Sequence, residues 1–193
     1  MRIGLVRHGQ TDWNAIGRIQ GQTDIALNGE GIRQAQALAD RLGSEPPLWN
    51  AVISSDLRRA YATAKIIGDT LDIPLLDPDP LLRERSFGEI EGTTLEEREE
   101  KYGESWREQE LGIESDEHLR ARGRKFLERR LLRNKEENLL IVTHGSFIAE
   151  MLLELCEELE DQRLHNLSYS ILERSGDSWL PLLHNCSKHL EHL

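Results

Sequence analysis

Short apolar runs alternate with stretches of helical periodicity along this chain, and no other feature constrains the fold as much. The runs at residues 2–6, 51–53 and 139–143 have the length and composition of buried strands. Strands that alternate with helices usually form a mostly parallel sheet that is covered on both faces. The sequence therefore predicts an α/β fold, a three-layer α/β/α sandwich with a mostly parallel central sheet.

The first two helices are predicted from apolar residues that repeat with helical spacing. Asn28 can cap a helix over residues 29–42, and the side-chain oxygens of Ser54, Ser55 and Asp56 can cap the next one. The expected inward faces are Ile32, Ala35, Leu38, Ala39 and Leu42 on the first helix, and Leu57, Ala60, Ala64, Ile67 and Leu71 on the second.

The second half of the chain continues the alternation, after a possible short strand at Leu75 and Leu76. Thr94 opens a capping-box pattern for a short helix. Ser115 can cap a longer helix, with Leu119, Phe126, Leu127 and Leu131 facing inward, and another helix is expected after Gly145. Two late strands, at residues 168–174 and 179–183, are joined by a Ser-Gly-Asp hairpin signal.

Length and charge limit the classes of protein. With 193 residues, 38% of them hydrophobic, the chain suits one domain over residues 1–193, in which residues 88–113 form a lid-like insertion. A formal net charge of −11 argues against nucleic acid and anionic membranes as partners. No apolar run approaches the roughly 20 residues that span a bilayer, and the N-terminus does not resemble a signal peptide. We therefore expect a soluble cytoplasmic protein.

The cysteines and the histidine-rich tail suggest no special site. Cys156 and Cys186 form no disulfide framework, and apolar neighbours predict that Cys156 is a buried free thiol. The histidines of residues 184–192 follow no spacing known for metal ligands, so no metal is expected. Edge strands near the C-terminus could pair in a homodimer, although nothing in the sequence requires one.

Polar side chains follow two of the predicted strands directly. Arg7 and His8 come after the first strand, and His144 comes after the strand at residues 139–143. Ligands of α/β sheets bind at this edge. Arg59, in the first turn of a helix, could join them to clamp a phosphate, since arginine forms bidentate contacts with phosphoryl oxygens. A neutral imidazole can attack phosphorus, and a carboxyl group such as Glu84 could protonate the leaving alcohol. Such a set requires neither metal nor cofactor.

These residues also carry a resemblance to a known family. Residues 5–14, with the sequence LVRHGQTDWN, resemble the signature of the histidine phosphatase superfamily, the phosphoglycerate-mutase-like enzymes. Four further segments match in the family's order, over residues 2–150 in all. They are residues 18–35, with RIQG and LNGEG; residues 54–64, with SSDLRRA; residues 82–92, with LRERSFG and EG; and residues 142–145, with VTHG.

The resemblance implies a role for each matching position. His8 corresponds to the residue that is transiently phosphorylated, and Glu84 to the proton donor for the leaving group. Arg7, Arg59 and His144 correspond to the groups that hold the phosphoryl oxygens. The remaining positions implied to line the phosphate pocket or its mouth are Thr11, Asn14, Arg18, Gln20 and Gly145.

The resemblance leaves the activity open between a phosphatase and a cofactor-dependent phosphoglycerate mutase. Mutases of the family carry a longer covering insert and an arginine pair after a Lys-Tyr-Gly segment. Here Lys101-Tyr102-Gly103 is followed by a net acidic stretch without such a pair, and Gln10 stands where mutases usually have glutamate. We therefore expect a metal-independent phosphomonoesterase of the histidine acid phosphatase type. It would act on a small phosphorylated metabolite through a phosphohistidine on His8.

A third possibility is a catalytically silent relative that binds a phosphorylated ligand. The presence of His8, Arg7, Arg59, Glu84 and His144 argues against it. Tyr102 and Trp106, in the lid-like insertion, could contact an apolar part of the substrate or could simply pack within the insertion.

Overall fold

The apolar runs of the sequence form the centre of one sheet. The computed structural model describes residues 1–133, 137–156, 164–191 and 193. Within these residues β1 (Arg2–Arg7), β2 (Ala51–Ser54) and β3 (Leu139–Thr143) run parallel in the order β2-β3-β1. A hairpin of β4 (Tyr169–Ser175) and β5 (Ser178–Cys186) extends the sheet beside β1 with antiparallel pairing. The predicted α/β fold is confirmed, with a parallel core and an antiparallel edge.

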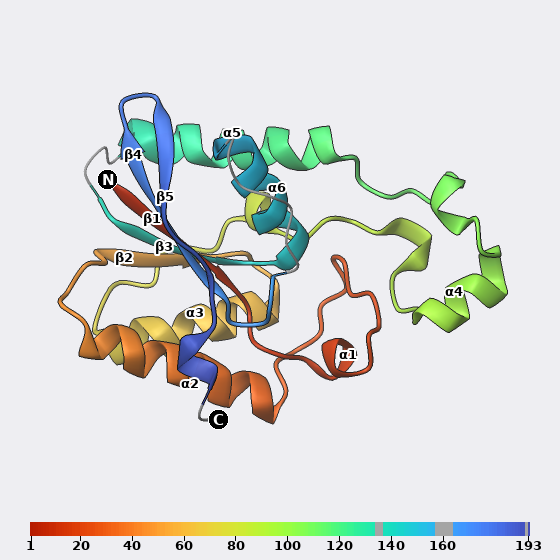
Figure 1. Cartoon of the computed structure of the whole chain (residues 1–193), viewed down its shortest axis with the longest axis horizontal. Helices are drawn as coiled ribbons and strands as arrows, with labels where there is room; N and C mark the ends of the chain where they lie inside the picture. The colour runs from red at the N-terminus through yellow and green to blue at the C-terminus, as the bar shows by residue number, and fades with distance from the viewer. Residues whose placement is uncertain (134–136, 157–163, 192) are drawn as a thin grey trace.

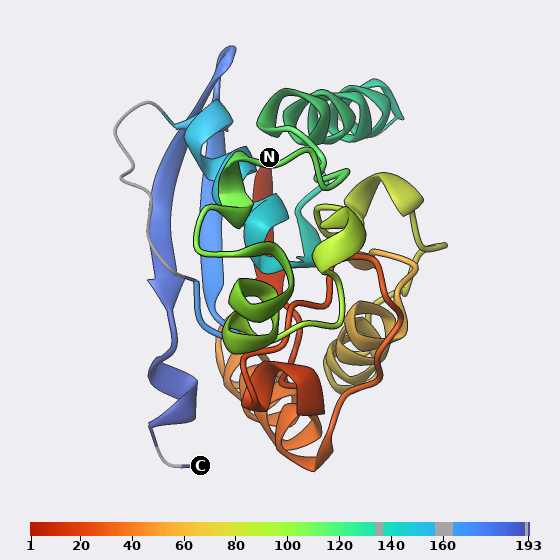
Figure 2. The same cartoon turned by 90° about the vertical axis from the view of Figure 1, so that its right-hand side faces the viewer.

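The two faces of the sheet are covered by different helices, because side chains alternate between the faces of a strand. Ile3 and Leu5 of β1 pack towards α5 (Asp116–Arg133) and α6 (Gly145–Leu155). Val6 of β1 packs on the other side, towards α2 (Gly29–Ser44) and α3 (Arg58–Leu71). Figures 1 and 2 show the resulting three layers. None of the helices in the described part of the chain is long and apolar enough to cross a membrane.

The start of α2 is as predicted, and that of α3 is not. Asn28 caps α2 by accepting a hydrogen bond from the N–H of Gly31. The residue before α3 is Leu57, and no side chain caps this helix. The predicted cap Asp56 instead accepts two hydrogen bonds from Arg83. This bidentate ion pair uses both carboxylate oxygens of Asp56.

Two further details of this half differ from the sequence prediction. Ile32, predicted on the inward face of α2, is 52% exposed, so this face is narrower than the apolar pattern suggests. Leu75 forms only an isolated bridge with Val52, so there is no strand at Leu75 and Leu76. The prolines that follow soon after, at positions 78 and 80, lack the N–H that would continue a ladder, and a 3-10 helix, η1 (Pro80–Leu82), begins there.

The later elements agree with their sequence signals. Thr94 and Glu97 form the predicted capping box of α4 (Leu95–Tyr102), and Ser115 accepts a hydrogen bond from His118 N at the start of α5. The expected inward side chain of Leu131 lies outside the described part. The hairpin of β4 and β5 is present, and Cys156 and Cys186 are free and buried.

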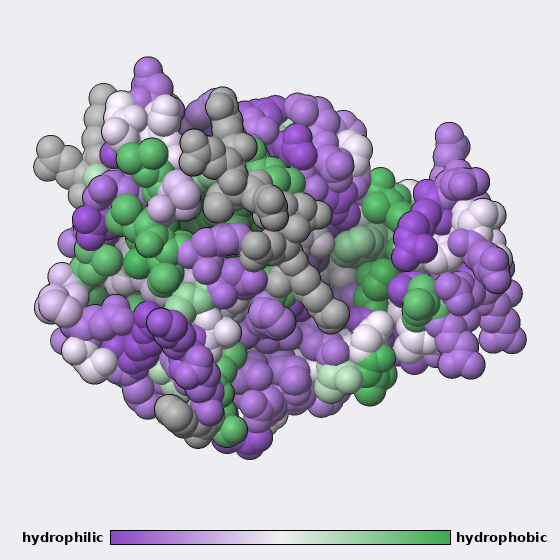
Figure 3. Space-filling view, viewed as in Figure 1, coloured by the Kyte–Doolittle hydropathy of each residue, from purple (hydrophilic) through white to green (hydrophobic). Residues whose placement is uncertain are grey.

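The segment of residues 88–113 stands beside the body of the molecule and has its own small core. It contains η2 (Gly88–Ile90), α4 and η3 (Trp106–Glu108), and its buried apolar residues are Ile90, Trp106 and Leu111. Figure 1 shows α4 far from the strands, and Figure 3 shows this part projecting from a face whose surface is mostly hydrophilic. The short helix α1 (Asp12–Ala15) follows β1, and η4 (Lys188–Leu190) ends the chain near α2.

Candidate active site

The two predicted histidines lie side by side because their strands are neighbours. In the parallel register of β1 and β3, Arg7 is opposite Thr143, so the next residues, His8 and His144, leave the sheet together. Their ring centroids are 5.1 Å apart, with the planes inclined by 61°. The sheet topology therefore unites two segments that are more than a hundred residues apart in sequence.

His8 is held in one tautomer by two contacts. Its Nδ1 lies 2.7 Å from the Gly9 carbonyl oxygen, and its Nε2 lies 3.2 Å from Nε of Arg59. A carbonyl oxygen only accepts and a guanidinium N–H only donates, so Nδ1 carries the proton and Nε2 carries the lone pair. Burial lowers the pKa of His8 well below 6.5, and the positive charges of Arg59 and Arg7 lower it further. His8 is therefore a neutral imidazole whose nucleophilic nitrogen faces Arg59.

Arg59 is buried at the start of α3 and fixed by the loop that follows α1. Its Nη1 donates to the carbonyl oxygen of Thr23 at 2.8 Å, and its Nη2 donates to that of Gly21 at 2.7 Å. Burial lowers its pKa from 12.5 to about 10, while the negative charge of Glu84 acts in the opposite direction. Arg59 therefore remains a cation at neutral pH, beside the reactive nitrogen of His8.

His144 is buried directly before α6. Neither of its ring nitrogens has a hydrogen-bond partner among the described residues. Burial lowers the pKa of His144 well below 6.5, and the charge of Arg59 contributes to the shift. With these neighbours the imidazole is neutral. A bound phosphate dianion would raise its pKa again.

Arg7 is the last residue of β1, and its guanidinium group lies beside Gly145. Its Nη1 donates to the carbonyl oxygen of Leu164 at 2.5 Å, and its charge acts on both His8 and His144. A Cβ atom at position 145 would lie only 3.3 Å from Nε of Arg7. Glycine at position 145 therefore lets α6 begin close to the guanidinium group.

Glu84, in the Arg-Glu-Arg run at residues 83–85, reaches the first residues of α6. Its Oε2 accepts from Ser146 N and its Oε1 from Phe147 N, each at 3.2 Å, and Oε1 also accepts from Arg85 N at 2.8 Å. The side chain of Arg83 pairs with Asp56, and that of Arg85 with Asp116 and Glu150. Both neighbouring arginines therefore pair with carboxylates other than that of Glu84.

Three further predicted residues surround the turn after His8. The amide oxygen of Asn14 accepts hydrogen bonds from Thr11 N and from Nδ2 of Asn166. The hydroxyl of Thr11 caps α1 and donates to Oε1 of Gln20 at 2.9 Å. Thr11 and Gln20 therefore support the loop, and the amide nitrogen of Asn14 is the group that could donate to a ligand.

Arg18 is not part of this cluster. It forms a bidentate ion pair with Glu97 of α4, with both N–O distances at 2.8 Å, and donates to the carbonyl oxygen of Gly92. Its guanidinium group lies 5.9 Å from the centroid of the Trp13 ring. The structure therefore uses Arg18 to attach the loop after α1 to the segment of residues 88–113.

Three residues that the sequence prediction omitted support the site. Thr63, one turn after Arg59, accepts from Gly9 N and donates to the carbonyl oxygen of Arg59. Asn166 donates to the carbonyl oxygen of His8 as well as to Asn14. The carboxylate of Glu91 accepts from Gln22 N and from both donors of Thr23, so it shapes the loop that holds Arg59. Thr63 and Glu91 both lie in segments that resemble the family, and this was the available signal.

The buried histidines make stability depend on pH. Because the pKa values of His8 and His144 are lowered from 6.5, the unfolded chain binds more protons than the native one below that pH. Their contribution to the free energy of unfolding is complete above pH 6.5. It decreases as the pH falls, by about 1.4 kcal/mol per pH unit for each imidazole that stays neutral in the folded protein. We expect urea unfolding to show this loss between about pH 7 and pH 5. A His144→Gln variant should lose less over the same interval, and an equal loss would contradict this explanation.

No group of three or more His, Cys, Asp or Glu side chains within the described residues could hold a metal ion. His192 of the histidine-rich tail lies outside those residues.

The chain is similar to several known proteins. Residues 3–187 match the sequence model of the histidine phosphatase superfamily (branch 1). A metal-independent phosphoserine phosphatase of Arabidopsis thaliana is 37% identical over 188 residues, which cover 92% of this chain and 78% of the relative. A probable phosphoglycerate mutase of Yersinia pestis (strain Pestoides F) is 35% identical over 193 residues, covering 93% and 88%. The solved structure of mycobacterial glucosyl-3-phosphoglycerate phosphatase in complex with VO3 has a TM-score of 0.84 and 31% identity, covering 96% and 98% of the two chains.

Proposed function

The chain belongs to the histidine phosphatase superfamily, and we propose that it is a metal-independent phosphatase that hydrolyses small phosphomonoesters through a phosphohistidine on His8. The observation that carries the proposal is the state of His8. Its unprotonated nitrogen lies 3.2 Å from a buried guanidinium group, and a second imidazole stands beside it. This combination suits a nucleophile whose target is a phosphoryl group.

In the first step a phosphoryl oxygen replaces His8 Nε2 as the acceptor of the Arg59 N–H. The lone pair of Nε2 then forms a bond to phosphorus while the bond from phosphorus to the ester oxygen breaks. Arg7, Arg59 and His144 hold the phosphoryl oxygens, on which negative charge is spread in the transition state. The acid form of Glu84 gives its proton to the departing alkoxide, so an alcohol leaves.

In the second step water hydrolyses the phosphohistidine. The carboxylate of Glu84 takes a proton from the water, whose oxygen attacks phosphorus as the bond between nitrogen and phosphorus breaks. Inorganic phosphate leaves, and both His8 and Glu84 return to their starting states. Hydrogen bonds from Ser146 and Phe147 keep the Glu84 carboxyl group in place for both proton transfers.

The surroundings of the site favour hydrolysis over mutase activity. A mutase has to hold a second anionic group of its substrate with basic side chains. Arg18 is paired with Glu97, and both Arg98 and Arg107 stack on Trp106, at 5.0 Å and 4.2 Å from its ring centroid. Arg98 and Arg107 therefore pack within the segment of residues 88–113, and Arg18 attaches this segment to the loop after α1.

The proposal is tested with a panel of phosphomonoesters assayed in the presence of EDTA. We expect release of inorganic phosphate. With 3-phosphoglycerate, formation of 2-phosphoglycerate in excess of free phosphate would instead identify a mutase. Phosphate binding without turnover of any ester would identify a silent ligand-binding relative.

The effect of removing the Glu84 acid on kcat/KM should depend on the leaving group. Glu84→Gln keeps the size of the side chain but cannot give up a proton in this way. We expect kcat/KM to fall by at least about a hundredfold for phenyl phosphate, whose phenolate needs a proton, and far less for 4-nitrophenyl phosphate. The ratio of the two kcat/KM values measures this. An unchanged ratio would show that Glu84 does not protonate the leaving group.

The acidic working range is also part of the proposal. Because burial lowers the pKa of His8, the nucleophile stays neutral well below pH 6.5. We therefore infer that turnover extends into mildly acidic solution, as the acid phosphatase type requires. A kcat/KM that declines below an apparent pKa near 6.5 in wild type, and declines in the same way when another histidine is replaced, would contradict it.

A further inference from the structure

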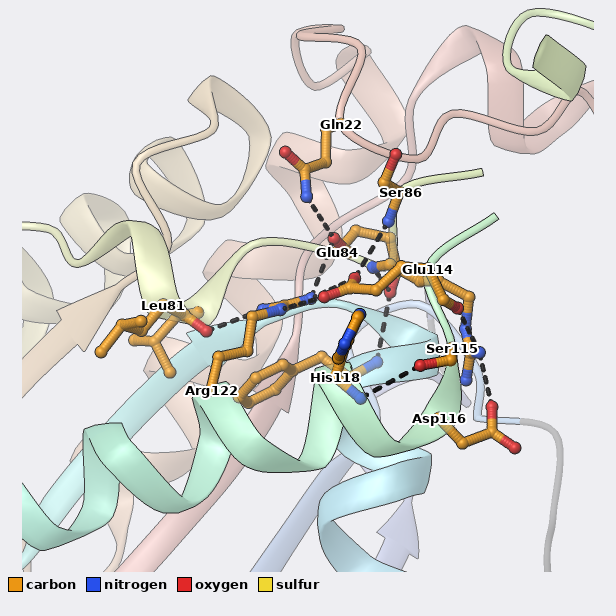
Figure 4. Close-up of polar contacts among 12 residues, drawn as sticks. Gln22, Leu81, Glu84, Ser86, Glu114, Ser115, Asp116, His118 and Arg122 are labelled. Carbon is orange, nitrogen blue, oxygen red and sulfur yellow. Dashed lines mark hydrogen bonds and ion pairs between the residues drawn. The ribbon is translucent and has the colours of Figure 1, made fainter. Parts of the chain in front are cut away.

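The segment that carries Glu84 is held by one arginine of α5. Arg122 donates from Nη1 to the carbonyl oxygen of Leu81 at 2.7 Å and from Nη2 to that of Glu84 at 3.1 Å. Figure 4 shows its side chain reaching from α5 to both carbonyl groups. One planar guanidinium group therefore fixes residues 81–84 at two points three residues apart.

Arg122 is itself fixed by Glu114. Its Nε donates to Oε1 of Glu114 at 2.9 Å and its Nη2 to Oε2 at 3.1 Å, and both side chains are only 15% exposed. Oε2 of Glu114 also accepts from Ser86 N at 3.2 Å. The pair of Arg122 and Glu114 therefore binds the backbone on both sides of Glu84 and limits its movement.

The same guanidinium group supports the other end of the Glu84 side chain. Cζ of Arg122 lies 5.1 Å from the ring centroid of Phe147, and the backbone N–H of Phe147 donates to Oε1 of Glu84. Arg122 thus contacts the residue that bears the carboxyl group and a residue that binds it. The neighbouring arginine of the same helix, Arg124, instead pairs with Glu117 and Glu154.

We propose that Arg122, locked by Glu114, is a positioning residue that sets the Glu84 carboxyl group for proton transfer to the leaving group. The inference rests on the proposed role of Glu84 and adds to it a largely buried ion pair that touches no reacting atom. A shift of about 1 Å in a catalytic group can cost up to about a hundredfold in rate, so precise placement of this carboxyl group matters.

The test compares kcat/KM for phenyl phosphate and 4-nitrophenyl phosphate in matched variants. Arg122→Lys keeps the charge but loses the planar fork, and Glu114→Gln keeps the shape but loses the charge that locks it. Arg124→Lys is the control, because its ion pairs resemble those of Arg122 and do not involve residues 81–86. Glu84→Gln is the reference, and thermal unfolding checks that each variant is folded.

We expect both Arg122→Lys and Glu114→Gln to lower kcat/KM about tenfold for phenyl phosphate and about twofold or less for 4-nitrophenyl phosphate. Arg124→Lys should behave like wild type for both esters. A purely structural role would lower kcat/KM for both esters by the same factor, and that result, or no change at all, would overturn the proposal while Glu84→Gln still shows selective loss. If Glu84→Gln itself lacks the selectivity, the role of Glu84 fails first, and this inference fails with it.

Discussion

A His8→Asn variant should lose at least about ten-thousandfold in kcat, the scale of loss seen when the nucleophile of a covalent mechanism is removed. Asparagine can keep a hydrogen bond to the Gly9 carbonyl group, but it has no lone pair on nitrogen that could attack phosphorus. Replacement of a buried, hydrogen-bonded imidazole by a smaller amide should still permit folding. Release of phosphate from the best ester of the substrate panel measures the effect.

A matched control separates chemistry from general disturbance. His184→Asn makes the same exchange in β5, an edge strand that is separated from β1 by β4. This control should retain kcat within about twofold, since surface changes away from a site usually have small effects. If His8→Asn kept a tenth or more of wild-type kcat, His8 could not be the nucleophile.

The second large effect is expected for Arg59→Lys. Lysine keeps the positive charge but cannot donate at once towards His8 and to the carbonyl groups of Gly21 and Thr23. Loss of a fixed donor at a developing charge typically costs a hundredfold to a thousandfold in rate. Because the freed loop should also shift, we expect a loss of about a thousandfold in kcat/KM.

The neighbouring residue supplies the control for this change. Arg58 is exposed and pairs with Asp24, so Arg58→Lys should alter kcat/KM by less than about twofold. Equal losses in Arg58→Lys and Arg59→Lys would contradict the assignment of Arg59 to the phosphate site. The sequence alone favours Arg59 through its family resemblance, and the buried contact with His8 supplies the physical reason.

The sequence was sufficient for the parts of the fold that depend on periodicity. The apolar runs of β1 and β3 predicted buried strands, and their parallel pairing brought His8 and His144 together at the same edge of the sheet. Local capping was predicted less well at α3, because a distant partner, Arg83, binds the expected cap Asp56. A tertiary ion pair of this kind leaves no local signal.

Long-range polar contacts also explain what the site prediction lacked. Arg18 has the right place in the sequence for a pocket mouth, but its bidentate pair with Glu97 turns it towards α4. The sequence does not show that Arg83 and Arg85 pair with other carboxylates and leave Glu84 to the backbone of α6. Arg122 stands in a helix with many charges, and only the contacts with Leu81 and Glu84 distinguish it from Arg124. Which arginine meets which carbonyl group depends on packing between elements, which periodicity does not encode.

The central claim, covalent catalysis by His8, is tested most directly by trapping the intermediate. Wild-type protein is mixed with a phosphorus-labelled ester for a fraction of a turnover, quenched in alkali and digested, and the labelled peptide is sequenced by mass spectrometry. The account predicts phosphate on the peptide that contains His8, stable in base, labile in acid and absent from the His8→Asn variant. Rapid ester hydrolysis with no labelled peptide, or with label on a different residue, would contradict it.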